Sequence, residues 1–196
     1  MQTFSDLSGE EKRALLSLAR WTIGRELGVT VPKDFFCTFA SFVKGHPLLR
    51  QKTGAFVTLR KAGDLRGCIG NMLGHSALHE TIASMAVSSA FRDPRFSPLA
   101  KEEFQEISIE ISVLSPLARI DSLQELEPGI HGLYITKGYC SGVLLPQVAT
   151  EQGWQREEFA LNTCRKAGLP PDALEDPETR LEIFSAQIFS EEDFKT

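Results

Sequence analysis

The segment Leu65-Arg66-Gly67-Cys68-Ile69-Gly70 follows the strand-like run Phe56-Val57-Thr58-Leu59-Arg60, and the chain is organised around this pair. Lys61-Ala62-Gly63-Asp64 between them supplies the Gly and Asp that a tight hairpin turn favours, so we expect antiparallel pairing. Side chains alternate along a strand, so Arg66 and Cys68 are expected on one face, with Gly67 leaving the opposite face bare. Glycine inside a strand often marks a bulge or a close approach of another backbone or a ligand.

Two interpretations of Cys68 stay open. A guanidinium two residues from a thiol is an arrangement that can lower a cysteine pKa, which makes Arg66 and Cys68 the first candidates for chemistry. A lone strand cysteine is, however, more often a small buried hydrophobic residue. If the turn is centred on Ala62-Gly63, Cys68 lies opposite Val57 and Arg66 opposite Leu59, which is an apolar setting. An odd-length loop would reverse that face.

Length and composition describe an ordinary globular protein. The chain has 196 residues, enough for one domain or two intimate subdomains, and 42% hydrophobic and 24% charged residues. A formal net charge of −5 argues against a dedicated nucleic-acid or anionic-membrane binder. No apolar run reaches the ~18 residues of a spanning helix. Because no signal peptide is visible and no CxxC pair exists, we expect reduced thiols, a cytoplasmic location and no structural zinc site.

Hydrophobic periodicity predicts the remaining elements. Ser8 followed by Glu11 forms a capping-box pattern at the start of a helix that Gly28 ends. Helices are also predicted over 75–91 and 155–167, a hairpin over 132–145 turning at Lys137-Gly138, and a last strand over 181–188. A short connection or helical turn is expected over 121–129. Four phenylalanines are expected to be buried anchors, namely Phe35, Phe36, Phe39 and Phe42.

Residues 106–114 are the clearest strand, because isoleucine and valine alternate with glutamate and serine. Glu110 lies in the middle of the polar face, where it can act as an acid, a base or an arginine partner, or remain a solvated carboxylate. His131 precedes Gly132 at the start of the predicted hairpin, and the glycine leaves the imidazole accessible. His131 is therefore a candidate base, although an isolated histidine is more often structural.

Two further charged groups have alternative interpretations. Arg92 and Arg95 flank Asp93, so they form either an anion-binding loop or a turn tied by salt bridges. His75 and His79 have a spacing that allows metal binding, but no third ligand accompanies them, and we expect no metal.

Several quoted segments resemble the AMMECR domain family, whose prokaryotic members are called protein A of the AmmeMemoRadiSam system. The resemblance runs over nearly the whole chain, in the family order, and rests on Leu65–Gly70, Arg92-Asp93-Pro94-Arg95-Phe96, Ile109-Glu110-Ile111-Ser112-Val113-Leu114, His131-Gly132-Leu133, Leu144-Leu145-Pro146-Gln147-Val148 and Thr163-Cys164-Arg165-Lys166-Ala167-Gly168-Leu169. It implies an α+β protein with a mainly antiparallel sheet and flanking helices. Residues 1–196 would form a single AMMECR-type domain made of two interleaved subdomains with a cleft between them.

The resemblance also implies an association with a Memo-like protein and a radical-SAM protein, and it points to the LRGCIG motif as the functional site. It implies neither a reaction nor a cofactor. We expect a small-molecule-binding protein or a thiol-dependent enzyme. The expected catalytic residues are Cys68, Arg66, Glu110 and His131, and the expected ligand-binding residues are Leu65, Gly67, Ile69, Gly70, Arg92 and Arg95.

The alternatives are a non-catalytic protein-docking module and, less favoured by the acidic charge, a nucleic-acid-binding regulator. A geometric expectation separates them. Arg66 and Cys68 should line a cleft, with Glu110 or His131 within ~8 Å of one of them, because reacting groups must lie close together. Glu110 is the expected partner of Arg66, and His131 that of the thiol. A Cys68 fully buried among aliphatic side chains would favour the docking module.

Overall fold

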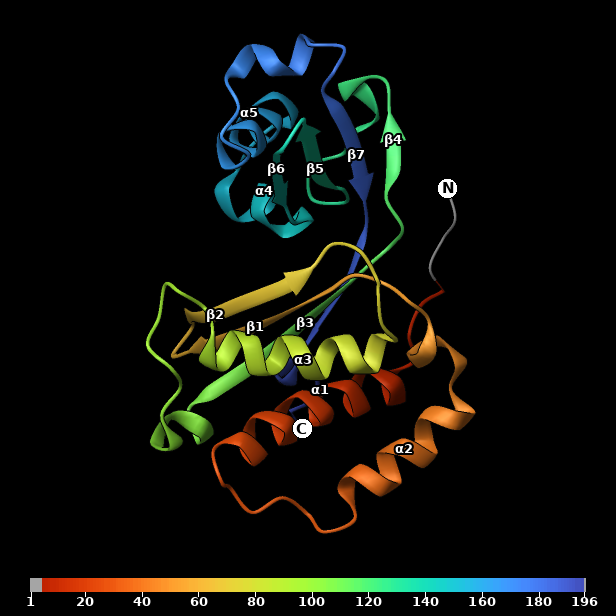
Figure 1. The fold of residues 1–196 in the computed structure, drawn as a ribbon, viewed down its shortest axis with the longest axis vertical. Helices are drawn as coiled ribbons and strands as arrows, with labels where there is room; N and C mark the ends of the chain where they lie inside the picture. Colours follow the sequence, from red (N-terminus) through yellow and green to blue (C-terminus); the bar gives the residue numbers. More distant parts are fainter. Residues whose placement is uncertain (1–4, 196) are drawn as a thin grey trace. The chain divides into compact units, whose positions relative to one another are not determined.

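The computed structural model describes residues 5–195 and has an α+β fold, which confirms the expected fold class (Figure 1). Within these residues, five α-helices accompany two four-stranded sheets. The chain divides into two compact units. Ser115–Ala186 form one unit, and this unit is inserted into the other, which comprises residues 5–114 and the segment from Gln187 onward. The chain therefore leaves the larger unit, builds the smaller one and returns.

The larger unit packs helices on one face of a sheet with strand order β2-β1-β3-β8. Its strands are β1 (Ala55–Lys61), β2 (Asp64–Asn71), β3 (Ile107–Leu114) and β8 (Ala186–Ser190). Helices α3 (Leu78–Phe91) and α1 (Gly9–Glu26) lie side by side below the sheet in Figure 1, and α2 (Phe35–Gly45) lies beyond α1. Leu15, Ile23, Leu59, Ile82 and Ile109 are fully buried in the resulting core.

The smaller unit has the strand order β4-β7-β5-β6. Its elements are β4 (Ala118–Ile120), a 3-10 turn at Leu123–Glu125, β5 (Gly132–Lys137), β6 (Cys140–Leu144), α4 (Pro146–Gln152), α5 (Arg156–Lys166) and β7 (Arg180–Phe184). Phe159 and Cys164 of α5 are completely buried against this sheet. Burial raises the pKa of the Cys164 thiol, which marks it as a packing residue.

Several predicted elements are confirmed. Ser8 caps α1 and forms the capping box with Glu11, and Gly28 follows the helix with φ of +66°. Strand β3 alternates as expected from Ile107 to Ile111, but the expected wet face ends there, because Ser112 is also buried. The helix predicted over 155–167 is α5, and the turn expected within 121–129 is the one at Leu123–Glu125.

Other predictions were wrong in detail. The single last strand is two strands, because the chain breaks at Ser185 and β7 and β8 belong to different sheets. Ser185 exchanges hydrogen bonds with Ser115 at 2.9 Å, which fixes the point where the chain changes sheets. The second hairpin turns at Gly138-Tyr139, one residue later than predicted. Of the four phenylalanines, Phe39 is buried and the other three are half-buried.

Candidate functional site

A β-bulge in the first hairpin decides where the LRGCIG side chains point. The turn is centred on Ala62 and Gly63, whose φ angles of 52° and 88° suit a type I′ turn. The register then shifts, because Leu59 pairs with Gly67 whereas the preceding pair joins Arg60 to Leu65. Arg66 is the extra residue of the bulge.

The bulge reverses the face of the following residues. Cys68 lies opposite Thr58, where an uninterrupted hairpin would have placed it opposite Val57. The predicted apolar setting for Cys68 was therefore wrong. The odd residue that reverses the face lies inside β2, and the loop itself has an even length of two residues.

Gly67 and Ser89 explain why the hairpin can pack closely on α3. A Cβ atom added to Gly67 would lie 2.2 Å from the carbonyl oxygen of Ser89, so no other residue fits without moving the helix. The Ser89 hydroxyl accepts a hydrogen bond from Ile69 N–H at 2.9 Å and donates one to the Val57 carbonyl at 2.7 Å. One helical side chain thus joins β1 to β2 beside the bulge.

The outer edge of β2 at Cys68 is held by the loop that follows α3. Asp93 Oδ2 accepts a hydrogen bond from Cys68 N–H at 2.9 Å, and Arg95 donates to the Cys68 carbonyl at 3.2 Å. Arg95 also contacts the Asp93 carboxylate at 2.7 Å, and the Asp93 side chain is 1% exposed. These hydrogen bonds, led by that from Arg95, hold the pKa of Asp93 well below its usual range.

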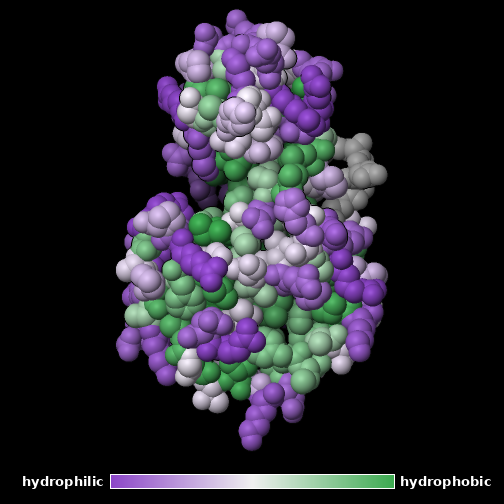
Figure 2. All heavy atoms as spheres, viewed as in Figure 1, coloured by the Kyte–Doolittle hydropathy of each residue, from purple (hydrophilic) through white to green (hydrophobic). Residues whose placement is uncertain are grey.

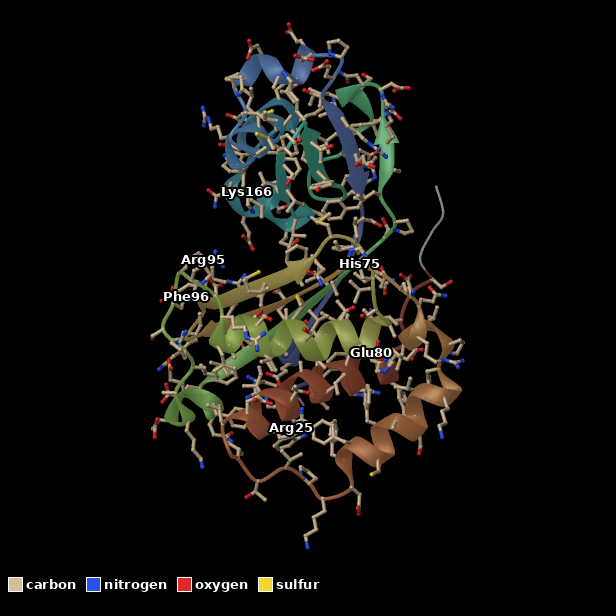
Figure 3. The ribbon with its side chains drawn as sticks, in the orientation of Figure 1. Arg25, His75, Glu80, Arg95, Phe96 and Lys166 are labelled. Atoms are coloured by element: carbon tan, nitrogen blue, oxygen red, sulfur yellow. The ribbon has the colours of Figure 1, made fainter. Side chains whose placement is uncertain are left out.

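Of the two interpretations of the Arg92–Arg95 loop, the geometry matches the salt-bridged turn. Arg95 and Phe96 lie at the C-terminal end of α3, whereas His75 and Glu80 lie at its other end (Figure 3). Arg92 is exposed. In this loop Asp93 and Arg95, and not Arg92, hold the backbone of Cys68 through their hydrogen bonds.

Arg66 is paired with Glu103, which is not among the predicted site residues. The guanidinium donates to both carboxylate oxygens of Glu103, at 3.0 and 2.9 Å, and to the carbonyl of Ser97 at 3.0 Å. Its carbon also lies 5.9 Å from the centre of the Phe96 ring. The hydrogen bond from Arg66 is the main cause of a Glu103 pKa lowered to about 2. Glu103 thus takes the place expected for Glu110 as the partner of Arg66.

Cys68, Thr58 and Glu110 form a row across three neighbouring strands. Thr58 pairs with Cys68 on one side and with Glu110 on the other, so their side chains share one face of the sheet. The Thr58 hydroxyl donates to Cys68 Sγ at 3.3 Å. Two strand spacings separate the Cα atoms of Cys68 and Glu110 by about 10 Å. Cys68 is half-buried. We call this set the Cys68 row.

The remaining motif residues frame this row. A Cβ atom on Gly70 would lie 2.3 Å from the ring of Phe56, so the glycine makes room for that aromatic side chain. Ile69 packs against the core of the larger unit, whereas Leu65 is 39% exposed. The side chain of Ser112, which pairs with Phe56 on the same face, is buried with no hydrogen-bond partner among the described residues.

His131 and the Cys68 row belong to different units of the chain. His131 belongs to the smaller unit, where its Nδ1 accepts a hydrogen bond from Glu127 N–H at 3.2 Å. Its expected proximity to the thiol stays a prediction, as does the cleft. His79 Nδ1 contacts the Leu49 carbonyl at 2.8 Å. Over residues 5–195 the structure contains no group of three or more His, Cys, Asp or Glu residues arranged to hold a metal ion.

Four residues at this site were missed by sequence reasoning, namely Thr58, Ser89, Asp93 as a backbone acceptor, and Glu103. Thr58 could have been selected only with the bulge known, because the uninterrupted register pairs it with Gly67. The one available signal was Asp93, which stands between two arginines in the quoted motif. Ser89 and Glu103 carry no such signal, since both lie in ordinary helical or polar patterns.

The comparisons with known proteins identify the family. A family model for AMMECR1 matches residues 16–189. The chain belongs to the AMMECR1 family. A relative from Methanothermobacter thermautotrophicus is 42% identical over 199 residues, covering 96% of this chain and 98% of the relative. Protein TK0174 from Thermococcus kodakarensis is 46% identical over 154 residues, covering 74% of this chain and 75% of that protein.

A solved structure has the same AMMECR1 fold. The crystal structure of the uncharacterized protein PH0010 from Pyrococcus horikoshii matches with a TM-score of 0.83 at 38% identity, covering 95% of this chain and 94% of that chain. The resemblance inferred from the motifs is therefore confirmed.

Proposed function

We propose that this AMMECR1 protein binds a small molecule on the sheet face around the Cys68 row and acts on it, or presents it, through the Cys68 thiol. The observation that carries the proposal is that Arg66 and the backbone of Cys68 are held by charged side chains, whereas, within the described part of the chain, the Cys68 thiol is not held in this way. Arg66 is paired with Glu103, and the backbone of Cys68 is held by Asp93 and Arg95. The thiol, in contrast, is half-buried and accepts a hydrogen bond from the Thr58 hydroxyl.

Each member of the row has a chemical role in this proposal. Cys68 is the nucleophile or the ligand-contacting thiol, since sulfur is the most nucleophilic of the common side-chain groups. Thr58 positions the sulfur through its hydroxyl, and Glu110 supplies a carboxylate for a polar group of the ligand. Arg66, Arg95 and the glycines hold the strand in place. A Cys68 enclosed by aliphatic side chains would have favoured the docking-module alternative, whereas Cys68 is half-buried beside a hydroxyl.

Native mass spectrometry after incubation in cell lysate tests the proposal. Wild-type protein should retain a small molecule, seen as added mass. The fraction of protein that carries this molecule should fall about tenfold or more in Cys68→Ser and in Glu110→Gln. Cys140→Ser is the matched control, because Cys140 is exposed and belongs to the smaller unit. Arg66→Ala is a poor probe, since it breaks the ion pair with Glu103. No retained mass on the wild type, or equal retention by Cys68→Ser, would contradict the proposal.

The wider setting is proposed on the family resemblance. The whole chain would work as one AMMECR-type domain in the cytoplasm, alongside a Memo-like protein and a radical-SAM protein of the AmmeMemoRadiSam system. Within residues 5–195, no helix combines the length and hydropathy needed to cross a membrane. Mixing the purified proteins and measuring complex formation by analytical ultracentrifugation checks the association. Independent sedimentation at micromolar concentration would count against it.

A further inference from the structure

A pocket lies in the larger unit between α1 and α2, and the Cys68 row contributes no residue to it. Its volume is about 250 Å³. One wall comes from α1, through Glu10, Arg13, Ala14 and Ser17, and the other comes from α2, through Phe35, Thr38, Phe39 and Phe42. Both sets follow helical spacing, so each is one continuous face of its helix.

The α2 wall consists mainly of aromatic side chains that the core does not fully use. Phe39 is buried, but Phe35 and Phe42 are half-buried, although their spacing predicted buried anchors. Figure 2 shows hydrophobic residues, in green, at the surface over α2. Ala14 packs against the core from the α1 side, and its small side chain leaves the space between the helices open. Phenylalanine walls around such a space suit an apolar or aromatic group.

The α1 wall places opposite charges one helical turn apart. Glu10 and Arg13 are three residues apart on α1, so their side chains are neighbours on the helix surface. Both residues are exposed, and the Arg13 guanidinium carbon lies 5.2 Å from the centre of the Phe194 ring. The hydroxyls of Ser17 and Thr38 are the other polar groups of the lining. A carboxylate and a guanidinium beside an aromatic pocket complement a molecule that carries both charges and an apolar side chain.

We propose that the α1–α2 pocket binds a free apolar or aromatic α-amino acid. The ligand carboxylate meets Arg13, the ligand ammonium meets Glu10, and the side chain enters between Phe35, Phe39 and Phe42. A pocket of about 250 Å³ holds about eight non-hydrogen atoms at the ~30 Å³ that a water molecule occupies in the liquid. A phenyl side chain fits that space while the charged groups stay at the mouth, where Glu10 and Arg13 are exposed.

Three probes of nearly the same shape test the two charge contacts. L-phenylalanine carries both charges, 3-phenylpropionate lacks the ammonium, and 2-phenylethylamine lacks the carboxylate. Binding is followed by the fluorescence of Trp21, whose ring lies 6.4 Å from that of Phe35, in protein carrying Trp154→Phe. L-phenylalanine should bind about threefold or more tightly than either analogue, the effect of one exposed ion pair.

Variants locate the site and assign each charge. Glu10→Gln should make the affinity for L-phenylalanine equal to that for 3-phenylpropionate, because the ammonium loses its partner. Arg13→Gln should make the affinity for L-phenylalanine equal to that for 2-phenylethylamine, because the carboxylate loses its partner. Thr38→Leu should abolish binding of all three probes by filling the pocket. Ala40→Leu is the matched control, since Ala40 is also exposed on α2 but does not line the pocket, and it should bind as wild type. Equal affinity for the three probes in wild type, or undiminished binding to Thr38→Leu, would overturn the proposal.

Discussion

At the scale of single residues, the LRGCIG motif separates into a supporting part and a working part. Arg66 is 13% exposed and anchored to Glu103, so its charge is already neutralised. Gly67 and Gly70 are required by close neighbours, a helix carbonyl and an aromatic ring. Cys68 is the member whose half-buried thiol lies on the same sheet face as Thr58 and accepts a hydrogen bond from its hydroxyl. The chemistry of the motif is therefore expected to depend on the thiol, and its stability on the other residues.

Acid should weaken the folded state through Glu103. Because Arg66 lowers the folded-state pKa of Glu103 to about 2, the unfolded chain takes up a proton at higher pH than the folded protein does. The stability from this ion pair is present above the unfolded pKa of ~4.3 and is lost as the pH falls toward 2.

Urea unfolding of wild type and Glu103→Gln measures this contribution. The variant should be less stable by about 1–2 kcal/mol at pH 7, a value reduced for partial solvent screening. The difference should shrink between pH 4.3 and 2. Glu102→Gln is the control, because Glu102 is exposed one residue away. Parallel stability curves for wild type and Glu103→Gln across that pH range would contradict the assignment.

At the scale of elements, the sequence predicts strands and helices well but does not predict their interruptions. The alternation of isoleucine with polar residues identifies β3, and the capping box identifies α1. Gly67 in the strand signals that a bulge or a close approach is there, but it does not fix which residue is the extra one, because Gly67 also packs against the Ser89 carbonyl of α3. The break at Ser185 was missed for a similar reason. Residues 180–190 are continuously strand-like, and tertiary pairing alone divides them.

Gly67→Ala tests the packing of β2 on α3. The added Cβ would meet backbone at 2.2 Å, so strand and helix must separate, and the free energy of unfolding should fall by about 3 kcal/mol or more. Gly45→Ala is the matched control, because nothing lies within 4 Å of a Cβ at that position, and it should change stability by less than about 1 kcal/mol. Chemical denaturation gives both values. Similar midpoints for the two variants would exclude a tight contact at Gly67.

A charge introduced on β3 should destabilise the protein strongly on one face of the strand and little on the other. Ile109→Asp places an unpaired carboxylate where the side chain is fully buried, which costs several kcal/mol and should unfold the protein or nearly so. Ser108→Asp lies on the half-buried face and should be tolerated. Thermal unfolding followed by circular dichroism compares the two variants. Equal melting temperatures would refute the assignment of the faces.

At the scale of the whole molecule, the family and the α+β class could be predicted, but the partners of the site residues could not. The order of the motifs along the chain predicted the family, and the match over residues 16–189 confirms it. Glu103 lies 37 residues from Arg66, and Asp93 lies 25 residues from Cys68. Both contacts depend on how helices and loops pack on β2. Spacing along a chain does not encode contacts of this kind.

The acidic charge of the chain makes a separate prediction about nucleic acids. With a net charge of −5, binding to mixed DNA or RNA should be weak and should vanish by ~200 mM salt, because it would be purely electrostatic. Fluorescence anisotropy with labelled oligonucleotides at two salt concentrations measures this. Submicromolar, sequence-selective binding that survives ~200 mM salt would show that the regulator alternative is correct.

The most direct test of the proposed function is the alkylation rate of each cysteine in the native protein, read by peptide mass spectrometry. If exposure alone set the alkylation rate, Cys37 and Cys140 would react fastest, half-buried Cys68 more slowly and buried Cys164 slowest. If Cys68 is the working thiol, it should react at least as fast as Cys37 and Cys140, and Thr58→Val should slow Cys68 alone. Rates that follow exposure, with Cys68 slower than both exposed cysteines and unaffected by Thr58→Val, would contradict the account.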